Sequence, residues 1–473
     1  MVPQKPEPPK TPRIEELLAR IERLEKLLTE KDRRIAELER LLEQSRRGGK
    51  RQAAPFSKGS VNASPKRPGR KPGADYGRQA TRPIPAKVDQ HILVGCPLFC
   101  PHCDGEVKVT GKMDQYQTEL PRPRAITRHF EIHTGRCTAC GKHVQAKHRL
   151  QTSAAREVGT VQLGPELIAT AAHMNKVEGL SYGRVSALLE RLYGVRVNRS
   201  SLARGLGRLA KRSEPSYEVL KAQLRAAPVV YPDETGWKIG GKNAWLHGAT
   251  DGAATTIYTI ESGRGYPEAA ELLGTDYAGT IASDGWAPYR KFESASRQAC
   301  LAHLLRRCNE MLETARGGAA RLPRALKAVL KRAFVVRDRR DQGILNSQSL
   351  RRHRTELEKD VGRILVGHYR DPQNRRLVKH IRTLEPDLFR FLEQPGLEGT
   401  NWPAETELRY AVINRKTCGG GNRTMQGART QSVLMTITRT ARKRNLDGVQ
   451  ILADLLRATH QSPHPHLLAD HHR

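Results

Sequence analysis

Two aspartates follow short β-branched segments near the middle of the chain. The segment VVY at residues 229–231 leads to Asp233, and the segment TIA at residues 280–282 leads to Asp284. A carboxylate at the exposed end of a buried strand packs poorly, but it suits a divalent cation because hard cations take oxygen ligands. If the two strands are neighbours, these residues form half of a metal-dependent phosphoryl-transfer site.

The surrounding pattern predicts elements that would make the two strands neighbours. We expect strands at residues 229–231, 244–249 and 255–260, with a hairpin signal at Gly240-Gly241, then a helix at 267–273 and a strand from Thr280. This is the element order of the ribonuclease H fold, an α/β fold in which the fourth strand lies beside the first. Asp233 and Asp284 would then meet, and two close carboxylates repel each other unless a cation lies between them.

Composition favours a nucleic acid as the partner. The 473 residues include 82 Lys and Arg against 49 Asp and Glu, a formal net charge of +33 that attracts polyanions. We expect no membrane association, because no apolar segment approaches the ~20 residues that span a bilayer. The Pro-, Lys- and Glu-rich N-terminus has no apolar signal core, so we expect a cytoplasmic protein.

A heptad repeat in residues 1–48 predicts a coiled coil, and therefore a homodimer or larger oligomer. The repeat comprises Ile14, Ile21, Leu28, Ile35 and Leu42 at one position and Leu17, Leu24 and Leu38 at the other. A helix docked on its own protein is the alternative. Residues 49–85 are a basic linker in which Arg67, Arg70 and Lys71 resemble arms that enter the minor groove of DNA, although a plain solvated linker fits as well.

Two CxxC motifs in residues 86–150 predict a structural zinc site, as in a zinc ribbon. The expected ligands are Cys100, Cys103, Cys137 and Cys140. Cys96 could replace Cys100, and His102 or His143 could compete. Reduced cysteines without metal are the alternative.

Residues 159–215 have a helical pattern that fits a helix-turn-helix. Gly194 is expected to end the first helix, and Ser200 or Ser201 to cap the second. The second helix would present Arg204 and Arg208 to DNA, although a helical hairpin that serves packing alone gives the same pattern.

The chain also resembles a known family in several sequence blocks. DETGW at Asp233, SDGWAPY around Asp284 and CLAHLLRR from Cys300, together with the heptads and the CxxC motifs, are similar to the IS66 family of bacterial insertion-sequence transposases. The resemblance implies a DDE catalytic core of ribonuclease H type at residues 226–303 and 396–445. It also implies a helical insertion at 304–395. Residues 446–473 are expected to form a C-terminal helix and a tail that is disordered, because histidines and prolines cluster from His460 onward.

The resemblance assigns the third carboxylate to Glu405, with Glu407 as the fallback. Trp402 and Thr406 stand where the family pattern has Asn and Arg. His303 and Arg306 would support the active site or serve packing. Zinc binding by Cys300, His303 and Cys308 is the weaker alternative for that block. Arg409, Arg415 and Lys416 flank the glutamate and are expected to contact DNA phosphates.

The resemblance therefore implies a DDE transposase that binds element ends and cleaves and joins DNA. Asp233, Asp284 and Glu405 would hold two Mg²⁺ or Mn²⁺ ions. Its partners would be double-stranded DNA of the element ends and the target, and accessory proteins of the same element, in the bacterial nucleoid. A catalytically impaired DNA-binding derivative and a nuclease of the same fold are the alternatives.

Overall fold

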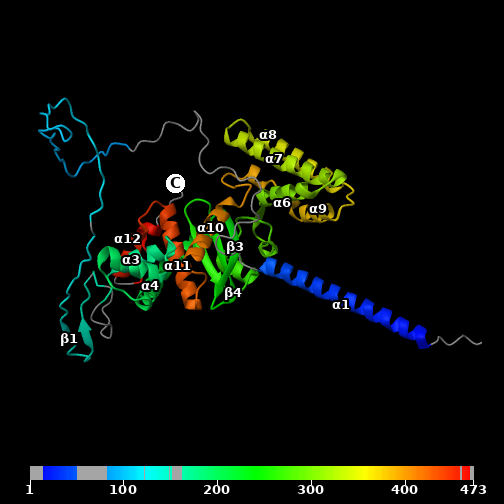
Figure 1. Cartoon of the computed structure of the whole chain (residues 1–473), viewed down its shortest axis with the longest axis horizontal. Helices are drawn as coiled ribbons and strands as arrows, with labels where there is room; N and C mark the ends of the chain where they lie inside the picture. Colours follow the sequence, from blue (N-terminus) through cyan, green and yellow to red (C-terminus); the bar gives the residue numbers. More distant parts are fainter. Residues whose placement is uncertain are drawn as a thin grey trace, which may run out of the picture. The chain divides into compact units, whose positions relative to one another are not determined.

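A five-stranded mixed sheet is the centre of the computed structural model (Figure 1). Its strand order is β5-β4-β3-β6-β7. The strands are β3 (Val229–Ile239), β4 (Lys242–Thr250), β5 (Thr256–Glu261), β6 (Thr280–Ser283) and β7 (Ser296–Ala299). β3 and β5 are antiparallel to β4, whereas β6 is parallel to both β3 and β7. The predicted fourth strand, β6, therefore lies beside the first, as expected.

The structure describes residues 14–50, 83–121, 123–148, 150–151, 162–458 and 461–468. The predicted minor-groove residues Arg67, Arg70 and Lys71 lie outside these ranges. The chain divides into two units, Met1–Gln117 and Thr118–Arg473, and the sheet belongs to the second.

Helices precede, interrupt and follow the strands. In chain order they are α1 (Ile14–Lys50), α2 (Pro165–Lys176), α3 (Tyr182–Tyr193), α4 (Arg199–Ala226), α5 (Tyr266–Leu273), α6 (Leu301–Thr314), α7 (Arg321–Asp341), α8 (Ser347–Leu365), α9 (Pro372–Leu384), α10 (Trp402–Thr417), α11 (Met425–Lys443), α12 (Gly448–Arg457) and α13 (Pro465–Leu468). A small hairpin of β1 (Thr134–Arg136) and β2 (His143–Gln145) precedes α2.

β3 is longer than the sequence predicted, so Asp233 does not lie at a strand end. β3 stays paired with β4 from Tyr231 to Ile239, but it pairs with β6 only at Val229 and Val230. The hairpin to β4 turns at Gly240 and Gly241, whose φ angles of 57° and 80° favour glycine. The sheet therefore opens between β3 and β6 just before the position of Asp233.

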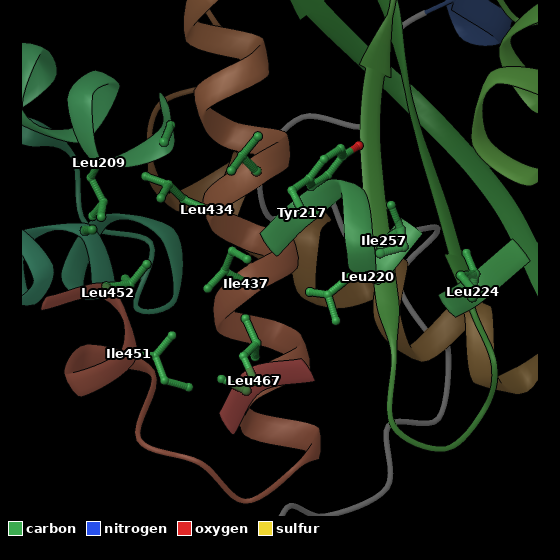
Figure 2. Close-up of a cluster of buried hydrophobic side chains, with 14 of the residues drawn as sticks. Leu209, Tyr217, Leu220, Leu224, Ile257, Leu434, Ile437, Ile451, Leu452 and Leu467 are labelled. Carbon is green, nitrogen blue, oxygen red and sulfur yellow. The ribbon is translucent and has the colours of Figure 1, made fainter. Parts of the chain in front are cut away.

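Helices α4 and α11 cover one face of the sheet, and α12 and α13 pack on these helices. Figure 2 shows their apolar side chains packed together: Leu209, Tyr217, Leu220 and Leu224 of α4, Leu434 and Ile437 of α11, Ile451 and Leu452 of α12, and Leu467 of α13, beside Ile257 of β5. Val230 and Ile281 bring the inner strands into the same core. Because Leu467 is fully buried, residues 461–468 are not the disordered tail that the sequence predicted.

The second helix of the predicted helix-turn-helix region differs from expectation at both ends. Its cap is Asn198, whose side chain accepts a hydrogen bond from the Ser201 backbone, rather than Ser200 or Ser201. It also continues through Pro215 to Ala226, past the predicted boundary at residue 215. Gly194 ends α3 in the left-handed conformation, as predicted.

The insertion helices α6 to α9 build a second core on the other face of β3 and β6. Leu326, Val329 and Leu330 of α7 are buried there, with Phe334 packed against the cluster. The same core contains Val229 and Tyr231 of β3, Ala282 of β6 and Ala404 of α10. Strand alternation therefore gives β3 one face toward α4 and α11 and one toward the insertion.

The N-terminal unit contains the long helix α1. Its described heptad residues Ile21, Leu24, Leu28, Ile35 and Leu38 are between 52% and 65% exposed. The helix is therefore present, and these described seam residues are exposed. No described helix combines the length and apolar character needed to span a membrane.

Candidate active site

Asp233 lies in β3, on the face that the strand turns toward the insertion. Two residues earlier, Tyr231 is part of the insertion core, so alternation places Asp233 on the same side of the sheet. Burial raises the pKa of the Asp233 carboxyl to about 7, and the negative charges of Glu234, Asp284 and Glu405 add to the rise. Asp233 is therefore a carboxylate that a nearby cation would stabilise.

Glu234, next to Asp233, is neutralised by an arginine held between two indole rings. Arg264 donates hydrogen bonds of 2.6 and 2.9 Å to Glu234 Oε1. Its guanidinium lies 4.7 Å from the ring centroid of Trp245 and 4.8 Å from that of Trp286. The Tyr289 hydroxyl donates to the other carboxylate oxygen of Glu234 at 3.2 Å. Glu234 is thus fully engaged by protein groups.

Asp284 follows β6 directly, in a loop that α9 supports. Its Oδ1 accepts a 2.9 Å hydrogen bond from the Trp286 backbone, which fixes the turn. Gly285 has a φ of 88°, and a Cβ placed there would lie 2.9 Å from Leu384 Cδ2 of α9. Since only glycine fits this position, Leu384 can pack directly against the loop that carries Asp284.

Glu405 lies in the first turn of α10 and faces two basic side chains of α6. His303 Nε2 is 3.8 Å and Arg306 Nη2 is 3.9 Å from Glu405 Oε1. Glu407, by contrast, is buried with a bidentate hydrogen-bonded ion pair to Arg439 of α11 at 2.5 and 3.1 Å. Glu407 is therefore occupied by a structural contact, whereas Glu405 makes only the two longer contacts with His303 and Arg306.

A chain of buried hydrogen bonds joins the three carboxylate segments. The Cys300 backbone N–H donates to Ser283 O at 2.7 Å, one residue before Asp284. Cys300 Sγ accepts from the Asn401 backbone at 3.1 Å, and Asn401 Nδ2 donates to Pro232 O at 3.0 Å, one residue before Asp233.

Asn401 also sets the start of the glutamate helix. Its carbonyl accepts the Glu405 backbone N–H at 3.1 Å. It occupies the N-cap position of α10, yet its side chain makes no cap hydrogen bond, because the amide is directed to β3 instead. Asn401 therefore ties the backbone of Glu405 to the strand that carries Asp233.

The donor set fits a hard cation, although the three carboxylates are not gathered around one point. Within the described ranges, no three His, Cys, Asp or Glu side chains are close enough to hold a metal ion. The negative charges of Asp284 and Glu405 nevertheless contribute to the raised pKa of Asp233, after its burial and the charge of Glu234. Oxygen donors with uncompensated negative charge are what Mg²⁺ binds.

The two CxxC motifs form loops with the same hydrogen-bond pattern. Cys100 donates its backbone N–H to Gly105 O, and Cys137 donates to Lys142 O, both at 2.8 Å. Backbone N–H groups within each loop, chiefly those of His102 and Cys140, lower the pKa values of Cys100 and Cys137. Each loop therefore favours thiolate, the form that binds zinc.

The predicted DNA-binding side chains are in different settings. Arg204 and Arg208 are exposed on α4, and Arg409 and Lys416 are exposed on α10. Arg415 is half-buried, where its guanidinium donates to Gly236 O and lies 5.5 Å from the Trp237 ring centroid. Arg415 therefore supports β3, in addition to any contact with DNA.

Sequence reasoning missed Asn401, Arg264 and Tyr289. The signal for Tyr289 was the SDGWAPY block itself, which ends on this residue. Arg264 and Asn401 act on residues 30 and 169 positions away, so no local pattern marks them.

Comparison with known proteins gives one family. The family model described as Transposase IS66 family matches residues 160–430, which are more than half of the chain. The match includes the sheet, the insertion helices and all three candidate carboxylates. No curated protein matches the chain. The chain belongs to the IS66 family of transposases.

Proposed function

We propose that this transposase has a ribonuclease H-like core and cleaves and joins DNA with Asp233, Asp284 and Glu405. The observation that supports the proposal most is the hydrogen-bond chain through Cys300 and Asn401, which connects the residues that flank these carboxylates. A strand order with β6 parallel to β3 and β4 antiparallel to it is also what a ribonuclease H-like core requires.

The chain's own residues would each have a defined part in the reaction. Two Mg²⁺ or Mn²⁺ ions bound by the three carboxylates would supply an activated water or DNA 3′-hydroxyl and a stabilised leaving oxygen. Asp233 would bind the metal ions in its ionised form. Because burial raises its pKa, it would release a proton when it does so. Arg264 neutralises Glu234, so Glu234 would not compete for the metal ions. His303 and Arg306 would position the Glu405 carboxylate before the metal ions bind.

The test uses purified protein with labelled element ends, target DNA and Mg²⁺. Asp284→Asn should abolish cleavage and strand transfer and leave DNA binding intact. Asp276→Asn, which changes an exposed aspartate outside the site, is the matched control and should retain both steps. Undiminished strand transfer by Asp284→Asn would refute the assignment.

The same assay distinguishes the two alternatives. A parent protein that binds the ends without cutting them is the catalytically impaired derivative. The Thr406 hydroxyl, which is buried and has no hydrogen-bond partner in the described part of the chain, is the feature that favours this outcome. Nicked products that are never joined would indicate a nuclease.

We also propose that the N-terminal elements organise the complex with DNA. The exposed seam residues of α1 support pairing with the same helix of a second copy, which would hold two element ends together. The hydrogen-bond pattern that the two cysteine loops share supports a zinc-binding role for the cysteines of each loop. Arg204 and Arg208, exposed on α4, would contact the element ends.

A further inference from the structure

A hollow of about 650 Å³ lies on the insertion, between α9 and the segment that connects it to α8. Its lining includes His368, Tyr369, Arg375, Lys379 and Arg382. No carboxylate lines it. We call this feature the basic hollow.

The cations of the basic hollow have no acidic partner within the described part of the chain. Arg375, Lys379 and Arg382 are exposed and form no ion pair there, and Arg382 only donates to the Leu365 carbonyl at 3.0 Å. Other arginines of the insertion do have acidic partners, as Arg332 has in Asp360 at 2.7 Å. Uncompensated cations that converge on a concavity attract an anion.

The spacing of these cations suits a polyanion rather than a single small anion. Arg375, Lys379 and Arg382 occupy positions i, i+4 and i+7, so they lie along one side of α9. Seven residues of helix rise about 10 Å. Phosphates of one DNA strand recur every ~3.4 Å along the duplex axis, so this length covers about four successive phosphates, which is enough for a separate phosphate at each of the three cations.

The helix that carries the hollow is also built against the Asp284 loop. His380 Nδ1 lies 3.0 Å from Arg307 Nη1 of α6. At the end of α9, Leu384 packs on Gly285, the residue after Asp284. DNA held in the hollow would therefore lie along a helix that ends at the candidate site.

We propose that the basic hollow binds the backbone phosphates of duplex DNA and so directs the duplex toward Asp284. This inference rests on the proposed function, because it assumes that the protein binds DNA. The contact is independent of sequence, since phosphates carry no base information.

The test compares two triple variants with the same loss of charge. Arg375→Gln, Lys379→Gln and Arg382→Gln are combined in one protein. The control combines Arg324→Gln, Lys331→Gln and Arg339→Gln, exposed α7 residues outside the hollow that likewise form no ion pair in the described ranges. Binding of labelled duplex DNA is measured over a salt series, and thermal unfolding verifies the folds.

In the hollow variant, we expect the slope of log affinity against log salt to fall in magnitude by about 2 to 3, because about three phosphate contacts are lost. DNA binding should be roughly 100-fold weaker than in the parent at 0.1 M salt. The control should change the slope by less than about 1. Equal losses in both variants would show diffuse charge attraction and overturn the proposal.

Two further outcomes are informative. Inorganic phosphate that binds the parent but not the hollow variant, while the two proteins bind DNA with equal affinity, would indicate a small-anion site and overturn the proposal. If the parent binds and cuts DNA but the hollow variant has the same salt slope as the parent, the role of the basic hollow is refuted while the proposed function stands. A parent that fails to bind DNA refutes the proposed function as well.

Discussion

Replacing Asn401 by alanine should impair the chemistry far more than the fold. The side chain is buried, and its only hydrogen bond within the described ranges is the 3.0 Å bond from Nδ2 to Pro232 O. Its loss removes one buried donor, which costs about 1–3 kcal/mol of unfolding free energy. Part of this cost is offset because Asn401 Oδ1 has no partner and is removed too.

The effect on the reaction should be larger because this amide holds the Glu405 helix to β3. A displacement of about 1 Å in a catalytic group lowers the rate roughly 100-fold. We therefore expect Asn401→Ala to slow strand transfer about 100-fold at saturating DNA, while the unfolding temperature falls by a few degrees.

Asn374 offers a closely matched control in the insertion. Like Asn401, Asn374 is 1% exposed. Its Nδ2 donates one 2.9 Å hydrogen bond to Ala319 O, and its Oδ1 has no partner in the described structure. Asn374→Ala should therefore lose a similar unfolding free energy but change the rate of strand transfer less than about threefold. Equal rate losses in the two variants, or a normal rate in Asn401→Ala, would refute the reasoning.

Three other predictions follow from the charges and thiols. Folding raises the pKa of Asp233, so the folded protein retains its proton more tightly and the carboxyl destabilises the fold increasingly from about pH 4 to about pH 7. With chelator present, the unfolding free energy of Asp233→Asn should equal that of the parent near pH 4 and exceed it by up to about 4 kcal/mol at pH 8. A difference in unfolding free energy that does not change with pH would contradict this prediction. Glu407→Gln should lower the unfolding free energy by about 3–5 kcal/mol in denaturant titrations because it leaves Arg439 without its buried partner, whereas Glu405→Gln should change it little. Metal analysis should find about one zinc per chain in the parent and none in Cys137→Ser, and equal zinc contents would exclude the cysteine site.

The elements of the sheet were predictable because their signals are local. The apolar segment at 229–231 and the Gly240-Gly241 turn lie within a few residues of the strands they define. Extension of β3 through Asp233 was not predictable in this way, because β4, rather than β6, holds that part of the strand. The continuation of helix α4 past residue 215 also depends on a contact with a distant part of the chain. Pro215 cannot donate to Lys211 O, but Gln461 donates to that carbonyl from the C-terminal segment at 3.3 Å.

The position of Glu405 depends mostly on contacts that its immediate neighbours do not make. Trp402 is exposed and lies under Arg409, with 5.6 Å between the guanidinium and the ring centroid, so its replacement of the family's Asn changes the surface rather than the support of the helix. Thr406 points its hydroxyl into a buried position without a partner there. Asn401, which anchors the helix to β3 and accepts the Glu405 N–H, is the residue that determines where the carboxylate lies. The two departures therefore alter what surrounds Glu405 while leaving its anchor intact, and on this ground we expect the parent protein to be active.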